Sequence, residues 1–164
     1  MDTNDWLTKH APGFANLSRE EREGIAHFAF LWSLFEGRVL NAGGSPEKLV
    51  QLAKSMTEQG SVNLALFAGP LEHFRIRYWL DGRPTYLFDG LNFRRGDRRP
   101  LVESVLSGQT NSSDDIVSAL LLIVYRLRNN LFHGMKWAYG IREQLANFQN
   151  ANEVLMRVLE RHAL

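Results

Sequence analysis

The segment that most constrains the fold is residues 116–127, which is apolar on nearly every side of the helix that it predicts. Ser113, Asp114 and Asp115 precede it, and a serine followed by acids is typical of a helix N-terminus, where free amides and the dipole favour oxygen atoms and negative charge. The apolar positions are Ile116, Val117, Leu120, Leu121, Ile123, Val124 and Leu127. A helix without a wide polar face must be enclosed by other elements, so the sequence predicts the central helix of a bundle.

Two further helices are predicted from the way they start. Ser18 and Glu21 form the pattern of a capping box, and apolar residues then recur at spacings of three and four as far as Val39. Ser45 followed by Pro46 marks another start, because proline has no amide to leave unpaired in the first turn of a helix. Both predicted helices have one apolar face, which suits them to packing against the central helix.

Helical patterns also occupy residues 62–80, 100–106 and 141–159, the first of them with an expected interruption at Gly69-Pro70. We therefore predict an all-α fold, a compact bundle of about five helices that forms one domain over residues 1–164. The chain contains 45% hydrophobic and 23% charged residues, which are ordinary values for a globular domain.

Several chemical classes are excluded or disfavoured by the sequence. The absence of cysteine excludes a disulfide framework, a thiolate zinc site and a cysteine nucleophile. No metal or cofactor is expected, because the other histidines lack metal-ligand spacing and no glycine-rich phosphate loop is present. The acidic N-terminus lacks the pattern of a secretory signal, and the longest apolar run, residues 119–125, is far shorter than the roughly 20 residues that span a membrane. We therefore expect a cytoplasmic protein without a membrane partner.

Residues 81–100 are predicted to form an irregular, basic connection. Turn-forming pairs such as Asp81-Gly82 and Asp89-Gly90 favour a long surface connection or a short hairpin. Because the net charge is only +1, nucleic acid would have to be bound through a local basic cluster. The densest cluster, which lies beside Phe93, consists of Arg94, Arg95, Arg98 and Arg99. Arginine with an aromatic neighbour suits single-stranded RNA, although a solvated loop would have the same composition.

The end of the predicted central helix contains the residues best suited to catalysis, Arg128, Asn129 and His133, followed by a glycine. Arginine presents a planar fork of donors to a phosphate, and histidine exchanges protons near neutral pH. The spacing by itself has little weight, because Arg22–His27 and Arg157–His162 repeat it without the asparagine and the glycine. The simplest alternative is a charged helix end that interacts favourably with the helix dipole.

The run Arg128-Asn129-Asn130-Leu131-Phe132-His133-Gly134 resembles the signature of HEPN domains, in which an arginine, a polar residue, three further positions and a histidine end a long helix. The resemblance implies a helical bundle, often a homodimer, and in many members a metal-independent endoribonuclease of toxin–antitoxin, phage-defence or RNA-processing systems. RNA would then be a partner, and a protein antitoxin could be another.

The resemblance also implies roles for individual residues. His133 would be the general acid or base, Arg128 would stabilise charge on the phosphate and Asn129 would position them, while the 2′-hydroxyl of RNA is the nucleophile. Asn130 is expected to join the arginine cluster in binding RNA. Glu36, at the edge of the apolar stripe of the first predicted helix, either orients Arg128 or His133 or is a rim residue paired with an arginine.

Two other interpretations stay open. A non-catalytic helical module could bind RNA, or a partner protein such as an antitoxin or a nucleotidyltransferase, through the same surface. A purely structural interaction domain would do neither. The three interpretations differ in what Arg128→Ala and His133→Ala would remove, which is cleavage, binding alone, or no activity at all.

Overall fold

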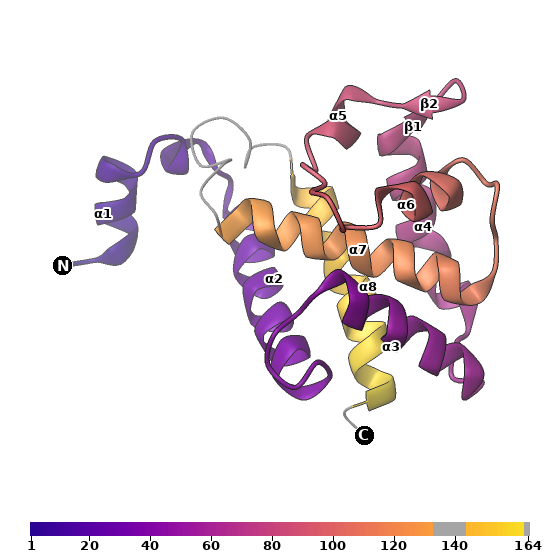
Figure 1. The fold of residues 1–164 in the computed structure, drawn as a ribbon. Helices are drawn as coiled ribbons and strands as arrows, with labels where there is room; N and C mark the ends of the chain where they lie inside the picture. Colours follow the sequence, from indigo (N-terminus) through magenta and orange to yellow (C-terminus); the bar gives the residue numbers. More distant parts are fainter. Residues whose placement is uncertain (133–143, 163–164) are drawn as a thin grey trace.

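The computed structural model describes residues 1–132 and 144–162, and this part of the chain is folded mainly into α-helices (Figure 1). The helices and strands are α1 (Thr3–His10), α2 (Arg19–Arg38), α3 (Pro46–Glu58), α4 (Ala68–Tyr78), β1 (Trp79–Leu80), β2 (Arg83–Pro84), α5 (Tyr86–Asp89), α6 (Arg99–Leu106), α7 (Ser113–Phe132) and α8 (Leu145–His162). Short 3-10 helices cover Phe14–Asn16 and Leu64–Phe67. The prediction of an all-α fold is confirmed, since the described strands form only a small antiparallel hairpin.

α7 lies at the centre of the bundle, as its apolar sequence predicts (Figure 1). It packs against α3, α6 and α8, while α2 packs along α8. Residues Leu120 to Val124 are fully buried, and they belong to one hydrophobic core that includes side chains of all the long helices. The helices α2, α3, α4, α7 and α8 are 11 to 20 residues long and build the bundle, in agreement with the expected number of main helices.

The predicted helix starts are found with their capping contacts. Ser18 Oγ accepts a hydrogen bond from the Glu21 amide at 3.1 Å, and the Ser18 amide donates to Glu21 Oε2 at 2.8 Å, which completes the capping box of α2. Ser45 Oγ accepts from the Lys48 amide at 3.3 Å, and Pro46 occupies the first turn of α3. Local contacts of this kind make these boundaries readable from sequence.

Two helical features differ from the prediction. The interruption expected at Gly69-Pro70 falls before it, because the 3-10 helix ends at Phe67 and Pro70 lies in the first turn of α4, where a missing amide leaves no bond unmade. α1 was not predicted, since it has no buried residue and hence no apolar stripe to reveal it. Figure 1 shows α1 standing apart from the bundle.

The connection after α4 contains the short hairpin that its turn residues suggest and also the four-residue helix α5, which was not predicted. Trp79, which lies within the helical pattern predicted for residues 62–80, instead begins β1 and is half-buried. The helix cannot continue because Asp81 and Gly82 adopt left-handed backbone angles, with φ of 49° and 75°, and reverse the chain into β2. Within the described residues, no helix is long and apolar enough to cross a membrane.

A buried polar network joins α4 to α8. Asn147 Nδ2 donates to the Tyr78 hydroxyl at 3.3 Å and to Gln144 Oε1 at 2.6 Å, and Asn147 Oδ1 is 2.8 Å from His73 Nε2. Tyr78 is 2% exposed, and desolvation by burial raises the pKa of its phenol from 10.0 to about 12. The folded protein therefore holds the Tyr78 proton more tightly than the unfolded chain does.

This difference predicts a loss of stability in alkali. Because the folded-state pKa of Tyr78 is raised, its contribution is fully present below the unfolded-state pKa and is lost as pH rises from about 10 to 12, a loss of about 2–3 kcal/mol. Tyr78→Phe should make the free energy of unfolding fall less steeply over this range in urea titrations. Tyr86→Phe is the matched control, since Tyr86 is 83% exposed, and an equal change of slope in both variants would contradict the prediction.

Candidate functional site

Arg128 lies in the last turns of α7, at the junction with α2. Its side chain is 28% exposed, and its guanidinium carbon is 5.6 Å from the Trp32 ring centroid and 5.5 Å from that of Phe132. Both separations are within the range of cation–π attraction, so the two rings hold the cation at the edge of the bundle. His133 follows Phe132 directly in the sequence but lies outside the described residues.

Glu36 lies beside Arg128, a contact that fits both interpretations of Glu36, the residue that orients Arg128 and the rim residue paired with an arginine. Glu36 Oε2 is 3.8 Å from Arg128 Nη2 and also accepts a hydrogen bond from Trp32 Nε1 at 3.2 Å. Its other oxygen, Oε1, accepts from the Gly44 amide at 2.8 Å. These bonds fix the carboxylate between α2 and the start of α3, where it complements the charge of Arg128 without a close bidentate pair.

Asn129 also contacts the arginine that precedes it. Arg128 Nη1 donates to Asn129 Oδ1 at 2.9 Å, whereas Arg128 Nε is buried without a hydrogen-bond partner among the described residues. Because Nε is buried, an arriving anion could meet only the part of the Arg128 side chain that stays exposed. The structure thus brings together Arg128, Asn129 and Glu36 from the predicted set.

Asn130 points to a different side of α7. Its Nδ2 donates to the carbonyl oxygens of Gly90 at 3.1 Å and Leu91 at 3.3 Å, and the residue is 4% exposed. These contacts hold the segment of residues 90–98, called the arginine strap below, against the helix. In the described structure the Asn130 amide binds backbone carbonyls of the strap. Its assignment to RNA binding stays a prediction.

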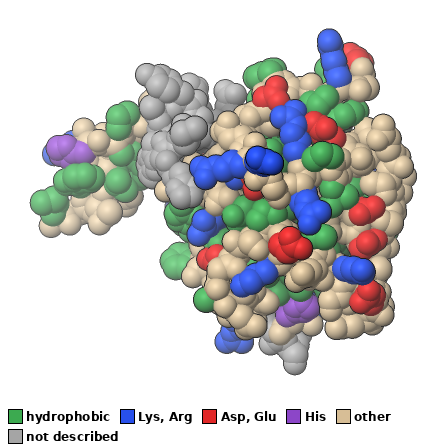
Figure 2. All heavy atoms as spheres, in the orientation of Figure 1, with side chains coloured by type: hydrophobic (Ala, Val, Ile, Leu, Met, Phe, Trp, Pro, Cys, Tyr) green, Lys and Arg blue, Asp and Glu red, His purple; other side chains and the backbone are tan. Residues whose placement is uncertain are grey.

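The four arginines of the predicted basic cluster differ in their surroundings. Arg98 pairs with Glu47 at 3.5 Å, and Arg99 pairs with Asp89 at 3.1 Å and with Glu103 at 2.8 Å. Arg94 and Arg95 are exposed and form no ion pair with any described residue. Figure 2 shows blue Lys and Arg side chains gathered on this face, over the connection between α5 and α6. Only part of the cluster is therefore available to a ligand.

Sequence reasoning missed the ion pair that anchors this region. Arg126 Nη1 lies 2.8 Å from Asp97 Oδ2, and Arg126 Nε donates to the Leu91 carbonyl at 3.0 Å. Desolvation by burial lowers the pKa of Arg126, and the charge of Asp97 partly opposes that shift. An arginine inside an apolar helix was the available signal, but nothing in the sequence indicates which acid it meets.

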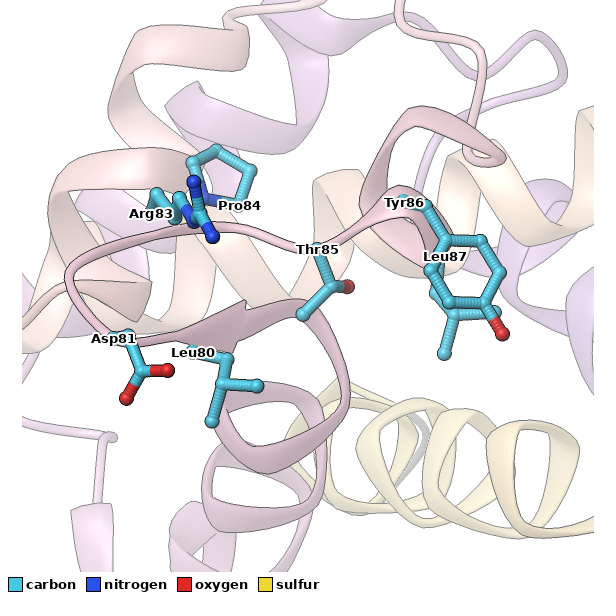
Figure 3. A pocket seen from close by; sticks show the side chains of 7 residues that line it. All are labelled: Leu80, Asp81, Arg83, Pro84, Thr85, Tyr86 and Leu87. Carbon is cyan, nitrogen blue, oxygen red and sulfur yellow. The ribbon is translucent and has the colours of Figure 1, made fainter.

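A hollow beside the hairpin is separate from these residues. It has a volume of about 420 Å³ and is lined by Leu80, Asp81, Arg83, Pro84, Thr85, Tyr86 and Leu87 (Figure 3). None of its lining residues belongs to the predicted site. Within residues 1–132 and 144–162, no group of three histidine or acidic side chains could hold a metal ion.

Comparison of the chain with protein-family models, curated proteins and solved structures gives no match. The functional assignment accordingly depends on the residues themselves and on their geometry.

The packing around Glu36 predicts opposite effects for two glycine substitutions. A Cβ at Gly44 would lie 3.0 Å from Trp32 Cζ2 and 3.4 Å from Glu36 Oε1, so Gly44→Ala should destabilise the fold by about 1–3 kcal/mol. A Cβ at Gly37, which lies in α2 next to Glu36, would meet no atom within 4 Å, and Gly37→Ala should stabilise the fold by about 0.5–1 kcal/mol. Urea unfolding midpoints distinguish the two, and equal effects would show that the described packing is wrong.

Proposed function

We propose that the chain is a metal-independent endoribonuclease of the HEPN type. The observation that carries the proposal is the partly exposed Arg128 guanidinium at the end of the central helix, between two aromatic rings and beside Glu36. The motif histidine, His133, follows this helix end in the sequence. Toxin–antitoxin or phage-defence systems would be the biological setting, a homodimer the working form, and the cytoplasm the location.

The proposed reaction needs only acid–base and electrostatic catalysis. His133 removes the proton of an RNA 2′-hydroxyl, and the resulting oxygen attacks the adjacent phosphorus while the bond to the 5′ oxygen breaks. A histidinium, supplied by the same motif or by its copy in a homodimer, returns a proton to the departing oxygen. The products are a 2′,3′-cyclic phosphate and a 5′-hydroxyl end.

Arg128 would act on the negative charge that develops on the phosphorane oxygens. The planar fork of its partly exposed guanidinium suits an oxyanion, and neutralising such charge with a fixed donor is among the strongest effects available to an enzyme. Asn129 and Glu36 would be positioning residues, because each contacts Arg128 and so limits the rotation of its guanidinium.

A specific observation also favours a second candidate, the non-catalytic binding module. Arg128 already contacts an amide oxygen and a carboxylate, so part of its donor capacity is used within the chain. In that case the same helix end would bind RNA, or a protein partner such as an antitoxin or a nucleotidyltransferase, without breaking a bond.

If the chain is an enzyme, it should cleave labelled single-stranded RNA in excess EDTA, and the products should carry 2′,3′-cyclic phosphate ends. His133→Ala and Arg128→Ala should each lower the cleavage rate by about 10²–10³-fold, with circular dichroism unchanged. His162→Ala is the matched control, because His162 has the same spacing from Arg157 on α8 and should leave cleavage at the wild-type rate. Folded wild-type protein that binds RNA but leaves a broad panel intact would support the binding module instead.

A further inference from the structure

The geometry points to the arginine strap as a phosphate-binding element for single-stranded RNA, anchored on α7 and presenting Arg94 and Arg95. Residues 90–98 run across α7 between α5 and α6 (Figure 1). The inference rests on the proposed function only for the identity of the ligand as RNA.

The strap is fixed from beneath by buried polar contacts. Arg126 is 3% exposed and Asp97 is 7% exposed, and their ion pair is supported by the bonds from Arg126 and Asn130 to the Leu91 carbonyl. A buried ion pair adds little to stability compared with a well-packed apolar pair, but it demands one geometry. The strap is thus held in a defined position on a rigid helix.

Asp97 transmits this position to the exposed end of the strap. The Asp97 oxygen that binds Arg126 also accepts a hydrogen bond from the Arg94 amide at 2.7 Å, and the Asp97 amide donates to the Arg94 carbonyl at 3.0 Å. Gly96 has a φ of 97°, a conformation that L side chains rarely adopt, and closes the turn. The turn leaves Arg94 and Arg95 exposed at its tip.

Charge pairing separates the arginines that can bind a ligand from those that are already used. Arg98 and Arg99 neutralise acids of α3, α5 and α6, whereas Arg94 and Arg95 have no acid partner among the described residues. Phe93 packs on Phe88 with ring centroids 5.2 Å apart and is half-buried, whereas the side chains of Arg94 and Arg95 are exposed. Binding through the strap is therefore directed to phosphates and tolerates many base sequences.

The position relative to Arg128 favours a flexible strand. Arg126 and Asn130 are four residues apart and face the strap, while Arg128 faces Trp32 on the nearly opposite side of α7. The two basic sites are then separated by at least about 10–12 Å, the diameter of a helix with its side chains, because the strap lies outside α7. A flexible single strand can bend to meet both sites, whereas a stiff duplex cannot follow that curvature.

The test measures binding separately from cleavage. Fluorescence anisotropy would follow the wild-type protein with a labelled 2′-O-methyl oligonucleotide of mixed sequence, which cannot form the attacking 2′ oxygen, over a range of salt concentrations. Arg94→Gln with Arg95→Gln should raise Kd about tenfold and lower the slope of log K against log salt by about 1.4, since each phosphate contact contributes about 0.7. A folded duplex of the same chemistry should bind more weakly than the single strand.

Arg83→Gln with Arg161→Gln is the control for net charge, because both side chains are exposed and the pair removes the same charge. This control should change Kd less than twofold. An equal loss of affinity in both double variants, or no loss in the strap variant, would overturn the proposal. Binding by wild-type protein that never cleaves unmodified RNA would leave the strap proposal standing and refute the proposed enzyme.

Discussion

The enclosure of α7 is the constraint on which the rest of the structure depends. Its apolar residues cover nearly the whole circumference, and water can be excluded from them only if other helices surround it. Burying one such side chain stabilises the fold by about 1.5–3 kcal/mol, so the many buried positions of α7 outweigh the weak propensities of the shorter elements. The bundle is arranged around this helix. Near the polar C-terminal end of α7, side chains of the helix become partly exposed.

Polar residues at that end differ in burial and in contact partners because successive helical positions point in different directions. Arg126 and Asn130 face the connection between α5 and α6 and are buried there, with backbone carbonyls and Asp97 satisfying their donors. Arg128 faces α2 and stays partly exposed beside Glu36. A buried charge without a partner would be strongly destabilising, so the face with Arg126 requires a fixed structure. Arg128 is partly exposed and can exchange its contacts with those of a ligand.

Sequence could predict the features that depend on neighbours along the chain. The caps at Ser18 and Ser45, the apolar periodicity and the helical pattern over residues 100–106 are local, and they predicted the main helices and the all-α class. The pairing of Arg126 with Asp97 and the approach of Gly44 to Trp32 join segments distant in the chain, and no local rule selects them. The Arg128–Glu36 contact agrees with both alternatives for Glu36, since helical spacing placed Glu36 at the edge of a face without fixing its partner or its role.

The same central helix places a mechanical limit on function. Arg128 and the anchor of the strap are within five residues of one another on α7, so neither can move appreciably without displacing the close-packed core that holds the helix. Any ligand that contacts both faces must therefore adapt its own shape to a fixed separation. This requirement favours a flexible polyanion over a rigid one. The fixed position of α7 thus determines where both Arg128 and the strap would meet such a ligand.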